Sequence, residues 1–185
     1  IGESVAVFGT GLQMVLASQW VRVAGAYDVY IVGDDPAGLA LARKLWLGER
    51  IDGSRGQGSE QILALRAGQG VDLAIVKAGD TQGLKMARKT IAVDGRIPVL
   101  ETPVVAFPGA EDSDNAPPGV PDPSEIRCPC VSWSRNDWEI AARTWGSGRL
   151  ALRDLIAEIL PLSELVRRIN QKDLGDGTHV VGILG

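Results

Sequence analysis

An apolar segment that runs into a glycine turn and then into a helix is the feature that most restricts the fold of this chain. Residues 5–14 read VAVFGTGLQM, in which 5–8 predict a buried strand and 11–23 predict a helix. A helix that directly follows a buried strand is typical of a crossover, which carries the chain to a parallel strand of the same sheet. Further strands of this kind are therefore expected along the chain.

The strand–helix alternation continues to about residue 100. Further strands are predicted at 28–32, 72–76 and 96–100, and further helices at 36–46, 59–67 and 81–91. Asp35 and Pro36 suit a helix start, because aspartate caps helices and proline fits the first helical position. Residues 50–52 are too short to assign. We expect an α/β fold, a doubly wound parallel sheet of Rossmann type with helices on both faces.

After residue 100 the pattern changes. Residues 101–125 carry most of the prolines and an acidic run, which predicts an exposed loop. A strand is predicted at 126–133, and Pro129 favours a place at the sheet edge because proline donates no ladder hydrogen bond. Helices at 136–145 and 162–171 and a strand at 179–184 follow. We divide the chain into a domain of residues 1–146 and a C-terminal helix–strand tail of residues 147–185.

Composition and charge exclude several classes of partner. The 185 residues are 45% hydrophobic and 23% charged, which is typical of a globular protein with a core. A net charge of −4 and a pI near 5.1 argue against a general nucleic-acid or anionic-membrane surface. No apolar run approaches the roughly 20 residues that cross a bilayer. We expect neither nucleic acid nor membrane among the partners, and no secretory leader is recognised.

The cysteines do not predict a metal centre. Cys128 and Cys130 form a C-x-C pair, and the single histidine, His179, is far away in sequence. A structural zinc site needs four ligands, so we predict no metal site from these residues. We interpret the pair as reduced, partly buried thiols of a cytoplasmic protein, and His179 as a structural residue of the terminal strand.

The glycine corner is suited to a diphosphate. Gly9 permits a tight turn, Gly11 lets the backbone approach a ligand closely, and the following helix offers unpaired N–H groups and the positive end of its dipole. In the pattern G-x-G-x-x-G the third glycine allows close helix–strand packing, and Met14 stands at that position. We therefore expect a nucleotide site with altered packing; an ordinary tight turn is the alternative.

An acidic residue that binds the adenine ribose is expected about 20 positions further on. The end of the second strand falls on Gly33, and Asp34 and Asp35 follow it. Asp34 reaches the ribose if the loop is shifted by one residue. The alternative is that both aspartates only solvate the turn and cap the next helix. Because two carboxylates without an adjacent arginine repel a 2′-phosphate, NAD is favoured over NADP.

Several segments, in the same order along the chain, resemble the medium-chain dehydrogenase/reductase family, the zinc-type alcohol and polyol dehydrogenases. They are residues 2–11 (GESVAVFGTG), 19–26 (QWVRVAGA), 34–36 (DDP) with 39–45 (LALARKL), 72–79 (DLAIVKAG), 94–97 (DGRI), and the tail segments 147–150 (SGRL), 155–156 (LI) and 160–162 (LPL). The resemblance covers nearly the whole chain outside residues 101–125.

The resemblance implies hydride transfer between a nicotinamide dinucleotide and an alcohol or carbonyl substrate. The residues that it places along the pyrophosphate are Gly9, Thr10, Gly11, Leu12 and Gln13. It places Asp34 near the adenosine ribose, and Ala78, Gly79 and the backbone after Leu100 near the nicotinamide. It also implies a homodimer through the edge strand 126–133, although Pro129 and the neighbouring acidic loop could instead protect that edge from pairing.

The chain departs from the family pattern at several positions. Met14 replaces the third glycine, Gly33 the ribose acid and Glu101 a glycine, and Ala157 and Glu158 replace a threonine and a histidine of the tail. The amino-terminal catalytic domain that supplies the family's zinc ligands is not in this sequence. Zinc is therefore expected only if such a domain supplies it, and the catalytic residues are unknown.

Three functions are compatible with these observations. The first is the nucleotide-binding portion of an NAD(P)-dependent oxidoreductase, with residues 1–146 as the dinucleotide-binding domain and residues 147–185 as a tail that returns to the catalytic domain. The second is a non-catalytic, degenerate Rossmann domain that binds a nucleotide or another protein. The third, a binder of S-adenosylmethionine type, fits the first turn but leaves the tail unexplained.

Overall fold

The computed structural model describes residues 2–100, 135–156, 158–171 and 180–183. The chain forms two compact units, Ile1–Ser134 and Arg135–Gly185. The predicted loop 101–125 and strand 126–133, with Glu101, Cys128 and Cys130, lie outside the described residues, as do Ala157 and His179. The assignment of residues 1–146 to cofactor binding and of residues 147–185 to a returning tail stays a prediction.

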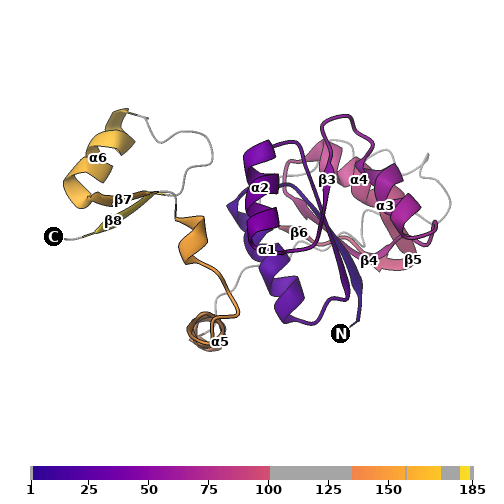
Figure 1. Ribbon diagram of the computed structural model, residues 1–185, viewed down its shortest axis with the longest axis horizontal. Helices are drawn as coiled ribbons and strands as arrows, with labels where there is room; N and C mark the ends of the chain where they lie inside the picture. The colour runs from indigo at the N-terminus through magenta and orange to yellow at the C-terminus, as the bar shows by residue number, and fades with distance from the viewer. Residues whose placement is uncertain (1, 101–134, 157, 172–179, 184–185) are drawn as a thin grey trace. The chain divides into compact units, whose positions relative to one another are not determined.

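A parallel sheet forms the centre of the first unit (Figure 1). Its strands are β1 (Ser4–Phe8), β2 (Asp28–Gly33), β3 (Glu49–Asp52), β4 (Val71–Lys77), β5 (Ile91–Arg96) and β6 (Val99–Leu100). The order is β3-β2-β1-β4-β5, and β6 also pairs with β4. Every pairing is parallel. The predicted doubly wound Rossmann-type sheet is confirmed.

Helices cover both faces of this sheet. They are α1 (Leu12–Val23), α2 (Pro36–Lys44), α3 (Gly58–Leu65) and α4 (Thr81–Thr90). In Figure 1, α1 and α2 lie on one side of the sheet, and α3 and α4 lie on the other. Both faces of β1 are buried: Ala6 and Phe8 belong to the core under α3 and α4, and Val5 and Val7 belong to the core under α1. Burial on both faces explains why β1 reads as one continuous apolar run.

The structure differs from the sequence prediction at the end of this sheet. A single strand was expected at 96–100, but β5 ends at Arg96 and β6 begins at Val99. Pro98 lies between them and has no N–H to donate, although its carbonyl accepts the N–H of Val76 (N to O, 3.1 Å). The residues paired with β4 jump from Ile91, opposite Val71, to Arg96, opposite Leu73, so the ladder contains an irregularity.

Two predicted helices are shorter than expected because each meets a residue in the left-handed region. The helix expected at 36–46 ends at Lys44, and Trp46 has a φ of 53°. The helix expected at 59–67 ends at Leu65, and Ala67 has a φ of 51°. A non-glycine residue with positive φ cannot continue a right-handed helix. The unassigned residues 50–52 belong to β3.

A partly buried hydrogen-bonded pair joins the amino ends of β1 and β4. The Asp72 carboxylate accepts the Ser4 backbone N–H at 2.8 Å and the Ser4 hydroxyl at 2.7 Å. In return the Ser4 hydroxyl oxygen accepts the Asp72 N–H at 3.2 Å. These bonds from Ser4 hold the pKa of Asp72 below its usual value. Ser4 is buried, so the pair removes the cost of an unpaired amide there.

Two ion pairs lie at the same amino edge. Arg66 donates to Asp28 at the start of β2 at 3.0 Å, and also to the Gly70 carbonyl. Arg96 donates to both carboxylate oxygens of Glu3, at 2.8 and 3.0 Å, and thereby lowers the pKa of Glu3. The amino edge of the sheet therefore carries hydrogen bonds between β1 and β4, an ion pair from the end of α3 to β2, and an ion pair from β5 to the residue before β1.

We expect Asp72→Ala to lower the free energy of unfolding by about 1–3 kcal/mol at pH 7, because the buried Ser4 amide loses its acceptor. Since the pKa of Asp72 is lower in the folded state, its contribution is complete above the unfolded value of about 3.9 and is lost as the pH falls through the folded value. Urea unfolding from pH 7 to pH 2 measures this. Asp94→Ala, at an exposed position, is the control, and equal effects of the two substitutions would contradict the prediction.

The second unit contains a strand–helix–strand crossover of its own. Its elements are α5 (Arg135–Gly146), a short 3-10 turn η3 (Arg153–Leu155), β7 (Glu158–Pro161), α6 (Leu162–Gln171) and β8 (Val180–Ile183). β7 and β8 pair in parallel, and α6 connects them. The helices predicted at 136–145 and 162–171 and the strand predicted at 179–184 are confirmed where described. β7 was not predicted, because its four residues end in a proline.

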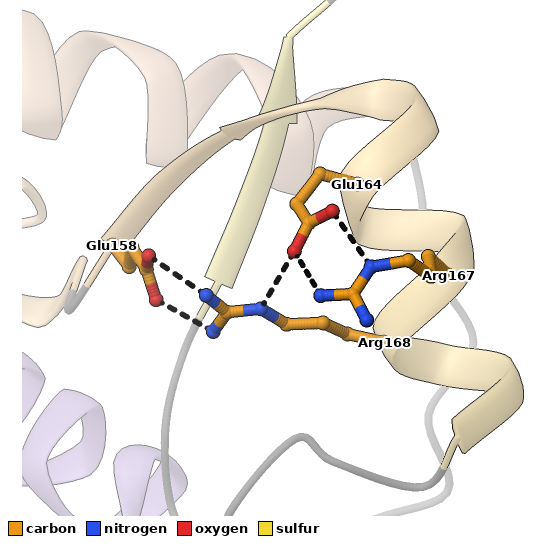
Figure 2. Close-up of polar contacts among 4 residues, drawn as sticks. All are labelled: Glu158, Glu164, Arg167 and Arg168. Carbon is orange, nitrogen blue, oxygen red and sulfur yellow. Dashed lines mark hydrogen bonds and ion pairs between the residues drawn. The ribbon is translucent and has the colours of Figure 1, made fainter.

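An ionic cluster holds the first turns of α6 against β7 (Figure 2). Arg168 donates to both oxygens of Glu158 at 2.9 and 3.2 Å, and its Nε lies 3.5 Å from Glu164. Arg167 also donates to Glu164, and the two arginines lower the pKa of Glu164 to about 2. Glu164 thus connects two successive arginines, one of which is bound to the preceding strand.

We expect the α6 contacts to weaken in acid. The pKa of Glu164 falls from 4.5 to about 2 on folding, so its contribution is present above pH 4.5 and is lost as the pH falls to about 2. Hydrogen exchange of the amides of residues 162–171 should show this loss in the native chain. Glu164→Gln should remove the pH step. Glu139→Gln, on exposed α5, should leave the exchange unchanged; a step that persists in Glu164→Gln would contradict this assignment.

Candidate functional site

The loops that follow β1, β2 and β4 meet at the carboxyl edge of the sheet. β1 lies between β2 and β4, with Phe8 opposite Val32 on one side and Val76 on the other. The helix after β1 covers one face of the sheet, and the helix after β4 covers the opposite face (Figure 1). The chain therefore leaves the adjacent strands β1 and β4 toward opposite faces of the sheet. This place is the topological switch point, where open α/β sheets bind their ligands.

Gly9 makes the turn that ends β1. Its φ is +111°, a conformation that L side chains rarely adopt. Its N–H donates to the Val32 carbonyl (N to O, 2.7 Å), which fastens the turn to the end of β2. A Cβ at Gly9 would lie 3.0 Å from Cγ of Met14. Glycine is required here by the backbone conformation and by the packing beneath it.

Gly11 caps α1 and leaves the helix mouth open. No side chain caps α1, and its first turn contains no acidic residue. A Cβ built at Gly11 meets no atom within 4 Å. The first N–H groups of a helix have no partner inside the helix and carry its positive dipole end. This corner therefore fits an anionic group such as a diphosphate.

Met14 belongs to the core and does not cover the helix mouth. Its side chain is 1% exposed and packs with Val5, Val7 and Ile75 between α1 and the sheet. The open space at Gly11 shows that the methionine does not reach it. The residue at the third glycine position thus fills volume below the turn.

We expect Met14→Ala to lower the free energy of unfolding by about 2–5 kcal/mol, because a fully buried side chain is removed from a packed cluster. Met14→Leu conserves volume and should lower it by less than about 1.5 kcal/mol. Thermal and urea unfolding measure both. Small, equal effects would mean that Met14 is not a packing residue.

The two aspartates after β2 have different surroundings. The Asp35 carboxylate accepts the N–H groups of Ala37 at 3.0 Å and Gly38 at 2.9 Å, and so caps α2. Asp34 is exposed and lines a pocket at the carboxyl edge. The helix cap expected at this turn is therefore Asp35, and the carboxylate that faces the pocket is Asp34.

The pocket spans the ends of three strands and the first turn of α4. Its lining residues are Phe8, Gly9, Val32, Gly33, Asp34, Gly53, Asp80, Gln82, Gly83 and Met86. Asp80 caps α4 by accepting the Gly83 N–H at 2.7 Å. The walls are apolar where β1, β2 and α4 pack, and two carboxylates and one amide provide the polar groups.

The predicted site residues form adjoining parts of this edge. Gly9 and Asp34 line the pocket, Thr10 is buried beside it, and Gly11, Leu12 and Gln13 form the start of α1. Ala78 and Gly79 form the turn after β4, where the Ala78 N–H donates to the Leu100 carbonyl (N to O, 2.7 Å) and Gly79 has a φ of +80°. Their roles toward a cofactor stay predictions.

Sequence reasoning missed Gly53, Asp80 and Gln82. Asp80 had a readable signal, because an aspartate between a strand and a helix is a typical N-cap. Gln82 had none: its amide nitrogen comes within 3.2 Å of a Cβ built at Gly56, a closeness that only the fold creates. Arg55 lies in the loop after β3, and its charge adds to the hydrogen bonds from Ser54 that lower the pKa of Asp52.

The described residues contain neither a metal-binding cluster nor a membrane-spanning helix. No group of three or more histidine, cysteine, aspartate or glutamate side chains in this part of the chain is placed to hold a metal ion. No helix of the described segments has the length and apolar character needed to span a bilayer.

Comparisons with known proteins connect this fold to alcohol dehydrogenases. No family model matches the chain. The alcohol dehydrogenase notN of Aspergillus sp. (strain MF297-2) is 34% identical over 102 residues, which are 55% of this chain and 29% of that protein.

Several solved structures share the fold. The zinc-dependent alcohol dehydrogenase 2 of Streptococcus pneumonia matches 100% of this chain and 53% of its own, with a TM-score of 0.74 and 19% identity. The 2R,3R-butanediol dehydrogenase of Bacillus subtilis matches 98% and 51%, with a TM-score of 0.74 and 20% identity. The benzyl alcohol dehydrogenase of Acinetobacter calcoaceticus matches 100% and 50%, with a TM-score of 0.76 and 17% identity.

These comparisons confirm the fold and the predicted resemblance to the cofactor-binding portion of medium-chain, zinc-type alcohol dehydrogenases. At 17–20% identity the solved structures establish the fold alone. The chain spans about half the length of these solved proteins.

Proposed function

We propose that this chain is the nucleotide-binding portion of an NAD(P)-dependent oxidoreductase of the medium-chain type, which transfers hydride between nicotinamide and an alcohol or carbonyl substrate. The observation that carries the proposal is the open corner at Gly9 and Gly11, at the switch point of a Rossmann-type sheet. The names of the similar proteins support the reaction class. This chain spans only part of those proteins, so hydride transfer is proposed for the whole protein of which this chain is the nucleotide-binding portion.

The residues of this edge suit a dinucleotide. The N–H groups at the start of α1 would bind the diphosphate through hydrogen bonds and the helix dipole. Asp34 would accept hydrogen bonds from the adenosine ribose, and the apolar walls of the pocket would hold the adenine. The turn at Ala78 and Gly79 would lie beside the nicotinamide end. When bound, the nicotinamide supplies hydride chemistry, and this portion of the protein binds and orients it.

Met14 and Gly33, which suggested a degenerate site in the sequence, have packing explanations. Met14 fills the core below the turn, and Gly33 gives room to Thr10. Neither residue blocks the helix mouth, so both are compatible with binding. Within the proposal, NAD is preferred to NADP because Asp34 faces the pocket. A homodimer through residues 126–133 stays part of the proposal.

We expect the 185-residue chain to bind NADH saturably and Gly11→Ala to weaken this binding by at least about tenfold, equivalent to about 1.4 kcal/mol. The backbone at Gly11 has φ −64° and ψ 166°, and a Cβ there meets no atom, so alanine should leave the fold intact. The added methyl group would occupy the space in which the diphosphate approaches the backbone. NADH fluorescence titration and thermal unfolding measure binding and fold.

Gly146→Ala is the matched control, because its Cβ also meets no atom and Gly146 lies in the second unit. It should leave NADH affinity unchanged and should not lower thermal stability, because alanine is favoured over glycine in a helix. A native chain that shows no saturable NADH binding, or a Gly11→Ala chain that binds as well as the native one, would overturn the proposal.

A further inference from the structure

We propose that Thr10 is a positioning residue that determines which side chain recognises the adenosine ribose. By filling the space at the end of β2, Thr10 excludes a side chain at position 33 and assigns ribose recognition to Asp34, one residue further on. The ligand class is an unphosphorylated ribose diol next to a diphosphate. This inference rests on the proposed function, because it concerns the adenosine half of the same site.

The exclusion is steric and lies between the turn after β1 and the last residue of β2. Thr10 is 8% exposed, and Gly33 is buried. A Cβ built at Gly33 would lie 2.4 Å from Cγ2 of Thr10 and 3.0 Å from its Oγ1. Carbon atoms in contact are normally about 3.5–4.0 Å apart, so no side chain fits at position 33 while Thr10 keeps its place.

Thr10 is held in that place from a second side. A Cβ at Gly38, in the first turn of α2, would lie 2.4 Å from Cβ of Thr10 and 2.9 Å from its backbone oxygen. The Gly38 N–H is bound to Asp35 at 2.9 Å, which fixes the start of α2. Thr10 therefore sits between two glycine backbones, and the Gly9 N–H bond to Val32 prevents the turn from moving away.

This packing leaves one carboxylate for the ligand at this turn. Gly33 has no side chain, and Asp35 is engaged in capping α2 through two hydrogen bonds. Asp34, between them, is exposed and lines the pocket together with Gly9 and Gly33. An ionised carboxylate accepts hydrogen bonds from a 2′-hydroxyl and repels a 2′-phosphate. Arg55, near Asp52 on the next loop, is the residue that would favour a 2′-phosphate instead.

The first experiment tests the contact without any ligand. Gly33→Ala should lower the melting temperature by about 4–8 °C, since overpacking a filled site is destabilising. In a Thr10→Ala background, the atom nearest to a Cβ at position 33 is Cβ of residue 10, at 3.3 Å. In that background Gly33→Ala should lower the melting temperature by less than about 2 °C. Thr10→Val, which keeps the branched shape, should behave like the native chain. Equal effects of Gly33→Ala in all backgrounds would overturn the steric part of the inference.

The second experiment relocates the carboxylate and measures NADH and NADPH affinity by fluorescence. Asp34→Asn should weaken NADH binding about tenfold or more, with little loss of NADPH binding. The triple variant Thr10→Ala/Gly33→Asp/Asp34→Asn should recover NADH binding and its preference over NADPH. Gly33→Asp/Asp34→Asn with Thr10 retained should not recover it, and its melting temperature shows whether that chain is folded. A role of Thr10 in stability alone would not move this preference.

The outcomes separate the inference from the proposed function. If the native chain binds neither dinucleotide, the proposed function and the ligand part of this inference fail together, while the melting temperatures still decide the contact. If the native chain binds NADH and Asp34→Asn binds it equally well, the inference fails and the proposed function stands. If the native chain prefers NADPH and Arg55→Ala removes that preference, ribose recognition by Asp34 is wrong.

Discussion

The hydrogen bond from the Gly9 N–H to the Val32 carbonyl is the interaction on which the arrangement of the carboxyl edge depends. Gly9 also adopts a φ of +111°, which turns the chain sharply after this bond and brings Thr10 against the end of β2. From that turn follow the position of Thr10 between two glycine backbones, the exposed mouth of α1, and the burial of Met14 beneath it. One backbone conformation thus sets both the packing and the accessible N–H groups.

Most of the first unit could be predicted from the sequence, because both of its signals are local. Buried parallel strands read as short apolar runs, and the helices between them start at recognisable caps such as Asp35 with Pro36. The predicted bounds of strands and helices were wrong where backbone conformation or pairing with distant residues determines them. Pro98 divides the last predicted strand, and left-handed residues end two helices early. β7 is defined by its pairing with β8, some twenty residues later in the chain, and not by its own four residues.

The candidate site divides in the same way. The positions of the glycine turn and Asp34 at the carboxyl edge could be predicted, because their spacing follows from one strand–helix–strand unit. The separate roles of Asp34 and Asp35 could not, since the choice depends on which carboxylate reaches the N–H groups of α2. Gln82 and Gly53 come from elements that meet only in the folded sheet. Met14 and Gly33 depart from the family pattern in the sequence. In the structure, Met14 fills the core below the turn and Gly33 leaves room for Thr10.

In the first unit, the contacts that brace the sheet are separate from the side chains that border the pocket. The bonds of Ser4 with Asp72 and the ion pairs of Arg66 and Arg96 brace the amino edge of the sheet, opposite the candidate site. Side chains that only border the pocket, such as Asp34 and Gln82, take no part in that bracing. Under the proposed function, substitutions there would alter ligand choice at little cost in the free energy of unfolding, which eases the trade-off between stability and activity that constrains many proteins. A fold of this kind can accept new side chains at its carboxyl edge, because the contacts that stabilise the sheet lie at its amino edge.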